Sequence, residues 1–222
     1  AFFHGPEFGE SGGGIKKIGG WIKDDPDLVY DGYIITDLPI ERLMTSHMAS
    51  NNTVTLAVQD HGADLRIAID GHRVTDVRGL IHQQQGTHQF TGIYVIDPEV
   101  IDLIPPNEKI SIIPAFVKLI KKGGLGAYHV KGHPKWLDLG TRETYLEASL
   151  AITPKVSKEA RISETANIQN SWVAQNAIVE SGAVIKDSIL WPGTHVLQDA
   201  ELTNCIVHSN SPISGVHKSS DL

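Results

Sequence analysis

A repeat of seventeen residues in the last third of the chain constrains the fold most strongly. Three consecutive segments align without gaps, at 160–176, 177–193 and 194–210, and their aliphatic residues recur at spacings of six, five and six. A helical stripe would recur at three and four residues and a flat strand at two, so the pattern favours a triangular coil with three short strands. The aligned positions are Ile162, Val179 and Val196; Ile168, Ile185 and Leu202; and Val173, Leu190 and Val207.

This spacing resembles that of a left-handed parallel β-helix of the hexapeptide type. An ordinary β-meander with coincidental spacing is the alternative. Three coils bury only a narrow core and leave open ends. We therefore expect the β-helix to pack against the rest of the chain or against a second subunit, which would make the protein a homo-oligomer.

The residues before the repeat follow a different pattern, in which short apolar runs alternate with amphipathic stretches. This alternation predicts an α/β domain. We divide the chain into an α/β domain at 1–152, a β-helix at 153–210 and a tail at 211–222. Strands are expected at 28–35, 53–58, 66–69, 90–96 and 126–130, and helices at 39–50, 98–103, 111–122 and 141–152.

Charge and composition exclude several classes of protein. The chain has 19 basic and 26 acidic residues and a formal net charge of −7, so we expect no broad basic surface for nucleic acid or for a membrane. Its one cysteine, Cys205, excludes a disulfide framework and a cysteine-built zinc site, and suits the cytoplasm. The chain begins at Ala1 without an initiator Met, as if it started inside an element.

A run of three glycines, Gly12, Gly13 and Gly14, is the first motif that could carry chemistry. Without Cβ atoms, the backbone N–H groups of such a run can approach a phosphate, a ribose or a base edge. The alternative is a flexible turn.

Two aspartates occupy positions where ligands often bind. Asp138 precedes the helix expected to begin at Thr141. Because Thr141 is the better placed cap, Asp138 is available to hold a hard cation. Asp31 ends an apolar strand, where α/β sheets usually bind ligands, although Asp31 and Gly32 together equally suit a turn.

Histidines offer a metal site that we do not adopt from the sequence. His129 and His133 are four residues apart, but Gly132 and Pro134 interrupt any helix that would place them on one face.

In this order, the motifs resemble the sugar-1-phosphate nucleotidyltransferase family, several bacterial members of which carry a C-terminal left-handed β-helix. The closest similarity is to mannose-1-phosphate guanylyltransferase-like and muramate-1-phosphate uridylyltransferase-like members. The resemblance implies a Rossmann-like, GT-A-like domain that forms an NDP-sugar from an NTP and a sugar-1-phosphate, with Mg²⁺ and release of pyrophosphate. It covers about residues 5–152 and rests on the segments 7–17, 27–36, 90–94 and 136–145.

The resemblance also implies roles for individual residues. Asp138 matches a catalytic, metal-binding carboxylate, Gly12 to Gly14 match the nucleotide cradle, and Thr91 with Gly92 match the sugar-phosphate pocket. Tyr33 stands where the family has its second metal aspartate, and a phenol with a pKa of about 10 is a poor Mg²⁺ ligand. Asp31 is two residues before Tyr33 and would lie on the same side of an extended strand as Tyr33. It reaches the metal only if the turn shifts.

Further expectations follow from the resemblance. The family's triphosphate-binding loop, Gly-x-Gly-Thr-Arg, does not occur in these 222 residues, so we expect a fragment that is inactive by itself. Arg78 lies where many members have Glu-Lys-Pro and either contacts phosphate or is a surface residue. The whole protein is expected to serve nucleotide-sugar synthesis for cell-surface polysaccharide in the cytoplasm. A catalytically inactive paralogue or regulatory subunit that binds nucleotide sugar is the alternative.

Overall fold

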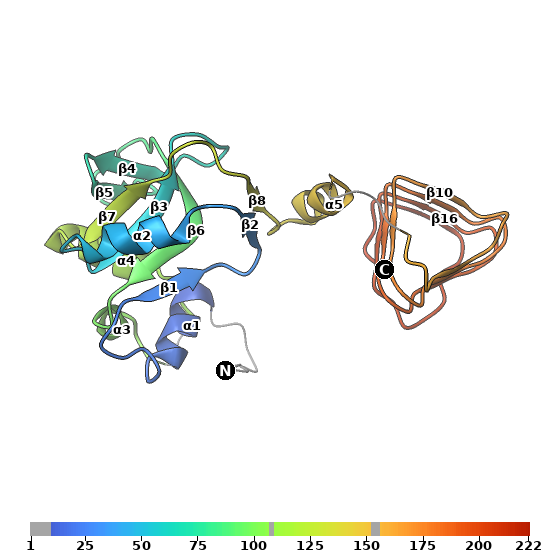
Figure 1. The fold of residues 1–222 in the computed structure, drawn as a ribbon, viewed down its shortest axis with the longest axis horizontal. Coiled ribbons are helices and arrows are strands. Elements are labelled where there is room, and N and C mark those ends of the chain that lie inside the picture. The colour runs from blue at the N-terminus through green and yellow to red at the C-terminus, as the bar shows by residue number, and fades with distance from the viewer. Residues whose placement is uncertain (1–9, 107–108, 152–155) are drawn as a thin grey trace. The chain divides into compact units, whose positions relative to one another are not determined.

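The computed structural model describes residues 10–106, 109–151 and 156–222, which form two compact units, Ala1–Trp136 and Leu137–Leu222. Figure 1 follows the chain through both. The predicted boundary at 152/153 lies outside the described residues, and the unit boundary falls earlier, within strand β8 (Trp136–Asp138). The last helix, α5 (Arg142–Ala151), therefore belongs to the second unit and not to the α/β domain.

The first unit is built on a six-stranded mixed sheet with the order β1-β6-β3-β7-β5-β4. Strands β3 and β7 are parallel neighbours, and the other pairs are antiparallel. The strands are β1 (Asp27–Tyr30), β3 (Val54–Gln59), β4 (Ile67–Asp70), β5 (Arg73–Val77), β6 (Gln89–Ile96) and β7 (Leu125–His129); β2 (Ile34–Thr36) lies outside this sheet.

Helices cover both faces of this sheet, as the alternation along β3 requires. Val54, Leu56 and Val58 point to one face, where they pack with residues of α1 (Glu10–Ile18) and α4 (Ile113–Lys122). Ala57 points to the other face and packs with Leu43 of α2 (Ile40–Met48). The short helix α3 (Val100–Leu103) contributes Val100 to the α4 face.

The structure differs from the predicted elements of this unit in three places. The glycine run lies inside helix α1 and is not a loop. The strand expected at 28–35 is divided into β1 and β2 by a turn at residues 31–33, and β5 was not expected. The remaining predicted strands and helices are present with ends shifted by a few residues.

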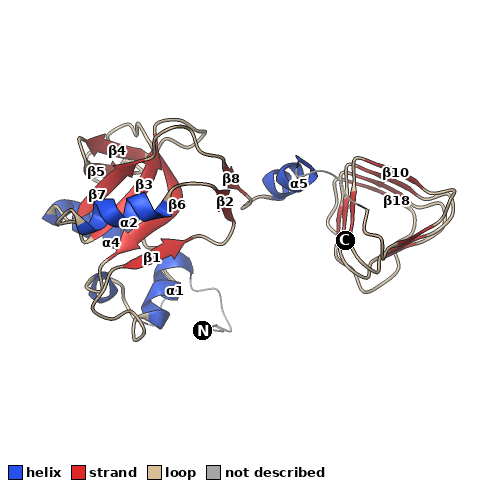
Figure 2. Ribbon diagram, viewed as in Figure 1, coloured by secondary structure: helices blue, strands red, loops and turns tan. Residues whose placement is uncertain are grey.

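The second unit contains the predicted β-helix, and the predicted fold class is confirmed. Figure 2 shows its triangular cross-section. Successive coils pair in parallel at the predicted spacing, as in Ile168↔Ile185 and Ile185↔Leu202. One face is formed by β9 (Arg161–Ile162), β12 (Ile178–Val179) and β15 (His195–Val196), and another by β11 (Trp172–Val173), β14 (Ile189–Leu190) and β17 (Ile206–Val207). The third is formed by β10 (Asn167–Gln169), β13 (Val184–Lys186), β16 (Glu201–Thr203) and β18 (Val216–Lys218).

Residues 211–222 continue the β-helix and are not a separate tail. Strand β18 pairs in parallel with β16, and Leu222 donates its backbone N–H to the carbonyl of Ile206 at 3.0 Å. The pair Leu202↔His217 is separated by fifteen residues, where earlier coils use seventeen. This last coil is shorter by two residues, so a search for a strict repeat of seventeen does not find it.

None of the helices that the structure describes has the length and apolar character needed to cross a membrane.

Candidate functional site

Three of the segments singled out in the sequence meet at strand β6. The backbone N–H of Asp31 donates to the carbonyl of Gly92 at 3.0 Å. On the adjacent residue, the carbonyl of Thr91 accepts the Nε1–H of Trp136 at 2.9 Å. The Asp-Gly turn, the Phe-Thr-Gly run and the start of the Trp-Leu-Asp segment are thus joined within one unit by two hydrogen bonds.

Gly92 makes this arrangement possible. Its φ of 77° lies in the left-handed region, and it falls where the pairing of β3 with β6 shifts register between Leu56 and Val58. A Cβ at Gly92 would lie 3.0 Å from Oδ2 of Asp31 and 3.1 Å from Cγ1 of Ile34. The missing side chain lets the Asp31 carboxylate rest directly on the strand.

Asp31 and Tyr33 converge at this turn. The Tyr33 hydroxyl donates to Oδ2 of Asp31 at 3.1 Å, and the turn is closed by the N–H of Ile34 on the carbonyl of Asp31 at 3.0 Å. Residues 31–33 are therefore not an extended strand, contrary to the expectation on which the alternation argument rested. The Tyr33 phenol thus contacts the Asp31 carboxylate, which is the group that would have to bind the metal ion in place of Tyr33.

Tyr94 is a feature of the site that the sequence did not reveal. It is 1% exposed, and its hydroxyl has no hydrogen-bond partner among the described residues. Burial raises the pKa of this phenol, and the nearby Asp31 and Tyr33 raise the pKa further because a second negative charge is unfavourable there. Only its place on β6, among apolar neighbours, could have suggested that this tyrosine is buried.

Thr91, which the resemblance matches to the sugar-phosphate pocket, has a structural role in this chain, and its part in that pocket stays a prediction. Its side chain is fully buried, and its hydroxyl donates to the carbonyl of Ala57 at 2.9 Å. Thr91 therefore fixes β6 against β3 and presents its carbonyl to Trp136.

The glycine run also has a structural role in this chain. Gly12 is buried, and a Cβ there would lie 2.7 Å from the carbonyl oxygen of Ile110. The N–H of Gly13 donates to the same oxygen at 3.0 Å. A Cβ at Gly14 would meet nothing within 4 Å. Because the N–H of Gly13 is already bonded to Ile110, the three glycines do not form a free row of backbone donors.

Asp138 lies in the second unit, two residues after Trp136. Its Oδ1 accepts the N–H of Gly140 at 2.7 Å, while Thr141 Oγ1 accepts the N–H of Thr144 at 3.2 Å and so caps α5. The expected Thr141 cap is present, whereas cation binding by Asp138 stays a prediction. Oδ2 of Asp138 has no hydrogen-bond partner among the described residues, which fits a carboxylate that can bind a hard cation.

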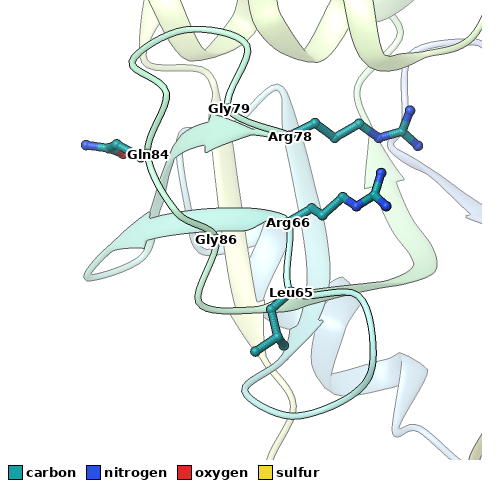
Figure 3. Close-up of a pocket in the computed structure, with 6 residues that line it drawn as sticks. All are labelled: Leu65, Arg66, Arg78, Gly79, Gln84 and Gly86. Atoms are coloured by element: carbon teal, nitrogen blue, oxygen red, sulfur yellow. The ribbon is translucent and has the colours of Figure 1, made fainter.

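A pocket of about 320 Å³ next to β4 and β5 brings two arginines together. Figure 3 shows the side chains of Arg66 and Arg78 extended to the same side, with Gln84 directed to the opposite side. Arg66 also forms an ion pair with Asp64. Arg78 is an exposed residue that lines this pocket, and Arg66, which sequence reasoning missed, lies beside it because the N–H of Arg78 donates to the carbonyl of Arg66 at 2.8 Å.

Comparison with known proteins bears on both units. A family model described as GlmU-like, C-terminal hexapeptide matches residues 142–218. The chain is 24% identical over 196 residues to mannose-1-phosphate guanylyltransferase of Mycobacterium tuberculosis, covering 84% of this chain and 55% of that protein. It is 27% identical over 163 residues to UTP–glucose-1-phosphate uridylyltransferase of Synechocystis, covering 68% and 42%. It is also 27% identical over 148 residues to glucose-1-phosphate adenylyltransferase of Acetivibrio thermocellus, covering 55% and 34%.

The chain is a relative of the sugar-1-phosphate nucleotidyltransferases. The resemblance drawn from the four motif segments and the β-helix is therefore confirmed. The chain spans 34% to 55% of the length of these curated relatives. Their names differ in the nucleotide and in the sugar, so they leave both open for this nucleotidyltransferase relative.

Proposed function

We propose that the protein to which these residues belong forms an NDP-sugar from an NTP and a sugar-1-phosphate. A phosphate oxygen of the sugar-1-phosphate would attack the α-phosphorus of the NTP, and pyrophosphate would leave. The observation that carries this proposal is the junction at Thr91 and Gly92, which joins three family-like segments by hydrogen bonds of 2.9 and 3.0 Å. In such a reaction the protein aligns two polyanions and neutralises their charge.

Individual residues are proposed as follows. Asp138 holds Mg²⁺ through the carboxylate oxygen that its turn leaves unpaired. Bound Mg²⁺ would neutralise phosphate charge. Gly92, which leaves β6 without a side chain at this point, borders the sugar-phosphate pocket. The glycines at 12–14 contribute to nucleotide binding only indirectly, through the packing of α1. Arg66 and Arg78 offer two guanidinium groups to a phosphate.

The finer expectations belong to the same proposal. The base is guanine or uracil, the product serves cell-surface polysaccharide synthesis, the location is the cytoplasm and the β-helix mediates a homo-oligomer. We also propose that the 222 residues alone give no turnover, because a Gly-x-Gly-Thr-Arg loop is not among them.

The decisive experiment measures pyrophosphate release by the full-length protein with each NTP and a panel of hexose-1-phosphates. We expect Mg²⁺-dependent turnover that Asp138→Ala lowers by about a hundredfold or more. The matched control is Asp70→Ala, which removes an exposed carboxylate at the end of β4, outside the four motif segments. Absence of turnover with every sugar phosphate, or equal activity of Asp138→Ala and the control, would contradict the proposal.

A second candidate function is favoured by Tyr33. Because its hydroxyl donates to the Asp31 carboxylate, the turn at residues 31–33 is poorly suited to binding a metal ion. This is what we expect of a non-catalytic subunit that binds nucleotide sugar. This function predicts ligand binding without Mg²⁺ dependence and no gain of activity in Tyr33→Asp. If Tyr33→Asp instead restores turnover to an inactive full-length protein, the chain is a damaged enzyme; Tyr30→Asp, at another exposed tyrosine of the same region, is the control.

A further inference from the structure

Two histidines and an aspartate lie together where β3 and β7 end. Asp60 and His61 directly follow β3, and His133 lies four residues after the end of β7. These strands are parallel neighbours, with Val58 opposite His129. The two loops therefore leave the sheet at the same edge, which is where ligands bind in open α/β sheets.

The potential ligand atoms are close enough to share one ion. One oxygen or nitrogen from each of Asp60, His61 and His133 lies within 4.8 Å of the others. The rings of His61 and His133 meet edge to face with their centroids 4.6 Å apart, and Nδ1 of His61 lies 3.0 Å from Oδ1 of Asp60. Two ligands of tetrahedral Zn²⁺ are about 3.4 Å apart, so the Asp60–His61 pair already spans one edge of such a site.

These groups are available to an ion. Both ring nitrogens of His133 and Nε2 of His61 have no hydrogen-bond partner among the described residues. The neighbouring histidines differ, because Nε2 of His129 bonds the carbonyl of Gly71 and Nδ1 of His88 bonds the hydroxyl of Thr87. The hydrogen bond from His61 is the main cause that lowers the pKa of Asp60, with smaller contributions from the charges of His61 and His133.

We propose that Asp60, His61 and His133 form a binding site for a divalent transition metal ion of the Zn²⁺ type. Imidazole nitrogens select such ions over Mg²⁺, which prefers oxygen ligands only. The ion binds between Oδ1 of Asp60 and Nδ1 of His61, the Nδ1 proton of His61 moves to Nε2 of the same neutral ring, and the His133 side chain rotates to bind the ion. Water completes the coordination, as it does at zinc sites with three protein ligands.

This site uses none of the carboxylates assigned to Mg²⁺ in the proposed function. It does not depend on that function, since Asp138, Asp31 and Tyr33 take no part in it. The contrast in ligand chemistry allows the two sites to be titrated separately.

The test is a calorimetric titration of the intact chain with ZnCl₂ at pH 7.5 in the presence of excess Mg²⁺. We expect one Zn²⁺ per chain, and binding about tenfold weaker or more in His133→Asn and in His61→Asn. His82→Asn, at an exposed histidine outside the cluster, is the matched control and should keep the wild-type affinity. Thermal melts without metal establish that each variant is folded.

Two further arms locate the ion. Substitution of Co²⁺ for Zn²⁺ should give visible absorption bands that are lost in His133→Asn and retained in His82→Asn. His72→Asn tests the neighbouring cluster of His72, His88 and His129, whose rings are 5.0 to 5.6 Å apart. Wild-type Zn²⁺ affinity in His133→Asn, an equal loss in His72→Asn or His82→Asn, or loss of binding in Asp138→Ala would each overturn the proposal.

Discussion

Asp76 illustrates how one buried carboxylate organises a loop. It is fully buried on β5, and its two oxygens accept the backbone N–H groups of Ile81, His82 and Gln84 at 3.2, 2.8 and 3.3 Å. Burial acts to raise the pKa of Asp76, but these hydrogen bonds outweigh burial and the pKa is lowered. The carboxylate thereby holds the segment that carries Gly79 and Gln84 of the arginine pocket.

We predict a pH-dependent contribution of Asp76 to stability. Because its folded pKa is below the ordinary value of 3.8, the ionised form stabilises the fold above pH 3.8, and this contribution is lost as the pH falls through the lower folded value. Asp76→Asn should lower the free energy of unfolding at pH 7 by about 1–3 kcal/mol. Urea titrations at pH 7 and pH 3 check this. A difference from wild type that does not shrink at pH 3 contradicts it, and Asp70→Asn, at an exposed aspartate on β4, is the control.

Single residues also mark the limit of what sequence could predict about the site. The Trp-Leu-Asp segment, Gly92 and the Thr141 cap are recognisable because residue type and local spacing determine their roles. The burial of Thr91 and Tyr94 is not, because it depends on which strands lie on either side of β6. Arg66 was missed for a similar reason, since its proximity to Arg78 depends on the pairing of β4 with β5.

At the scale of elements, the β-helix was predictable and helix α1 was not. Each face of a coil buries one aliphatic residue, so the repeat directly reports the strand register. Helix α1 contains three glycines, which destabilise helices intrinsically, and it forms because Ile15 and Gly12 pack against the sheet and the 110–112 segment. Strand β5 was missed because its buried Asp76 interrupts an apolar pattern.

Helix α1 offers a prediction with an internal control. A Cβ at Gly12 would lie 2.7 and 2.9 Å from backbone atoms of Ile110 and Ser111, which cannot rotate away, whereas a Cβ at Gly14 meets nothing within 4 Å. Gly12→Ala should therefore lower the free energy of unfolding by about 1–3 kcal/mol. Gly14→Ala should raise it by about 0.5–1 kcal/mol through helix propensity. Chemical denaturation of both variants checks the pair, and equal effects of the same sign would show that the packing of Gly12 does not matter.

At the scale of the molecule, the two units have separate apolar cores. Among the described residues, the β-helix core, which includes Val179, Ile185 and Leu202, is formed by residues from 160 to 222, and the cores around Phe116 and Leu43 are formed by residues up to 136. The sequence separated the two patterns, although α5 is grouped with the β-helix in the structure.

Separate cores predict that residues 137–222 fold when expressed alone. We expect a β-type circular dichroism spectrum and a cooperative thermal transition, because the buried side chains of this unit are all present. If its faces or open ends pair with a second copy, sedimentation will give more than the monomer mass. A chain without a cooperative transition contradicts the first expectation, and the variant Ile185→Asp, which places a charge at a fully buried position, should abolish the transition.

The shortened last coil has a consequence for how the β-helix folds in time. Every strand pairing in it joins residues only fifteen or seventeen positions apart, including the final one between β16 and β18. Closing each coil therefore costs nearly the same small loss of chain entropy. No coil depends on pairing with a strand that is distant in the sequence. The β-helix can grow coil by coil from any point of nucleation, and its amide protons should exchange fastest in the terminal coils, which have a neighbour on one side only.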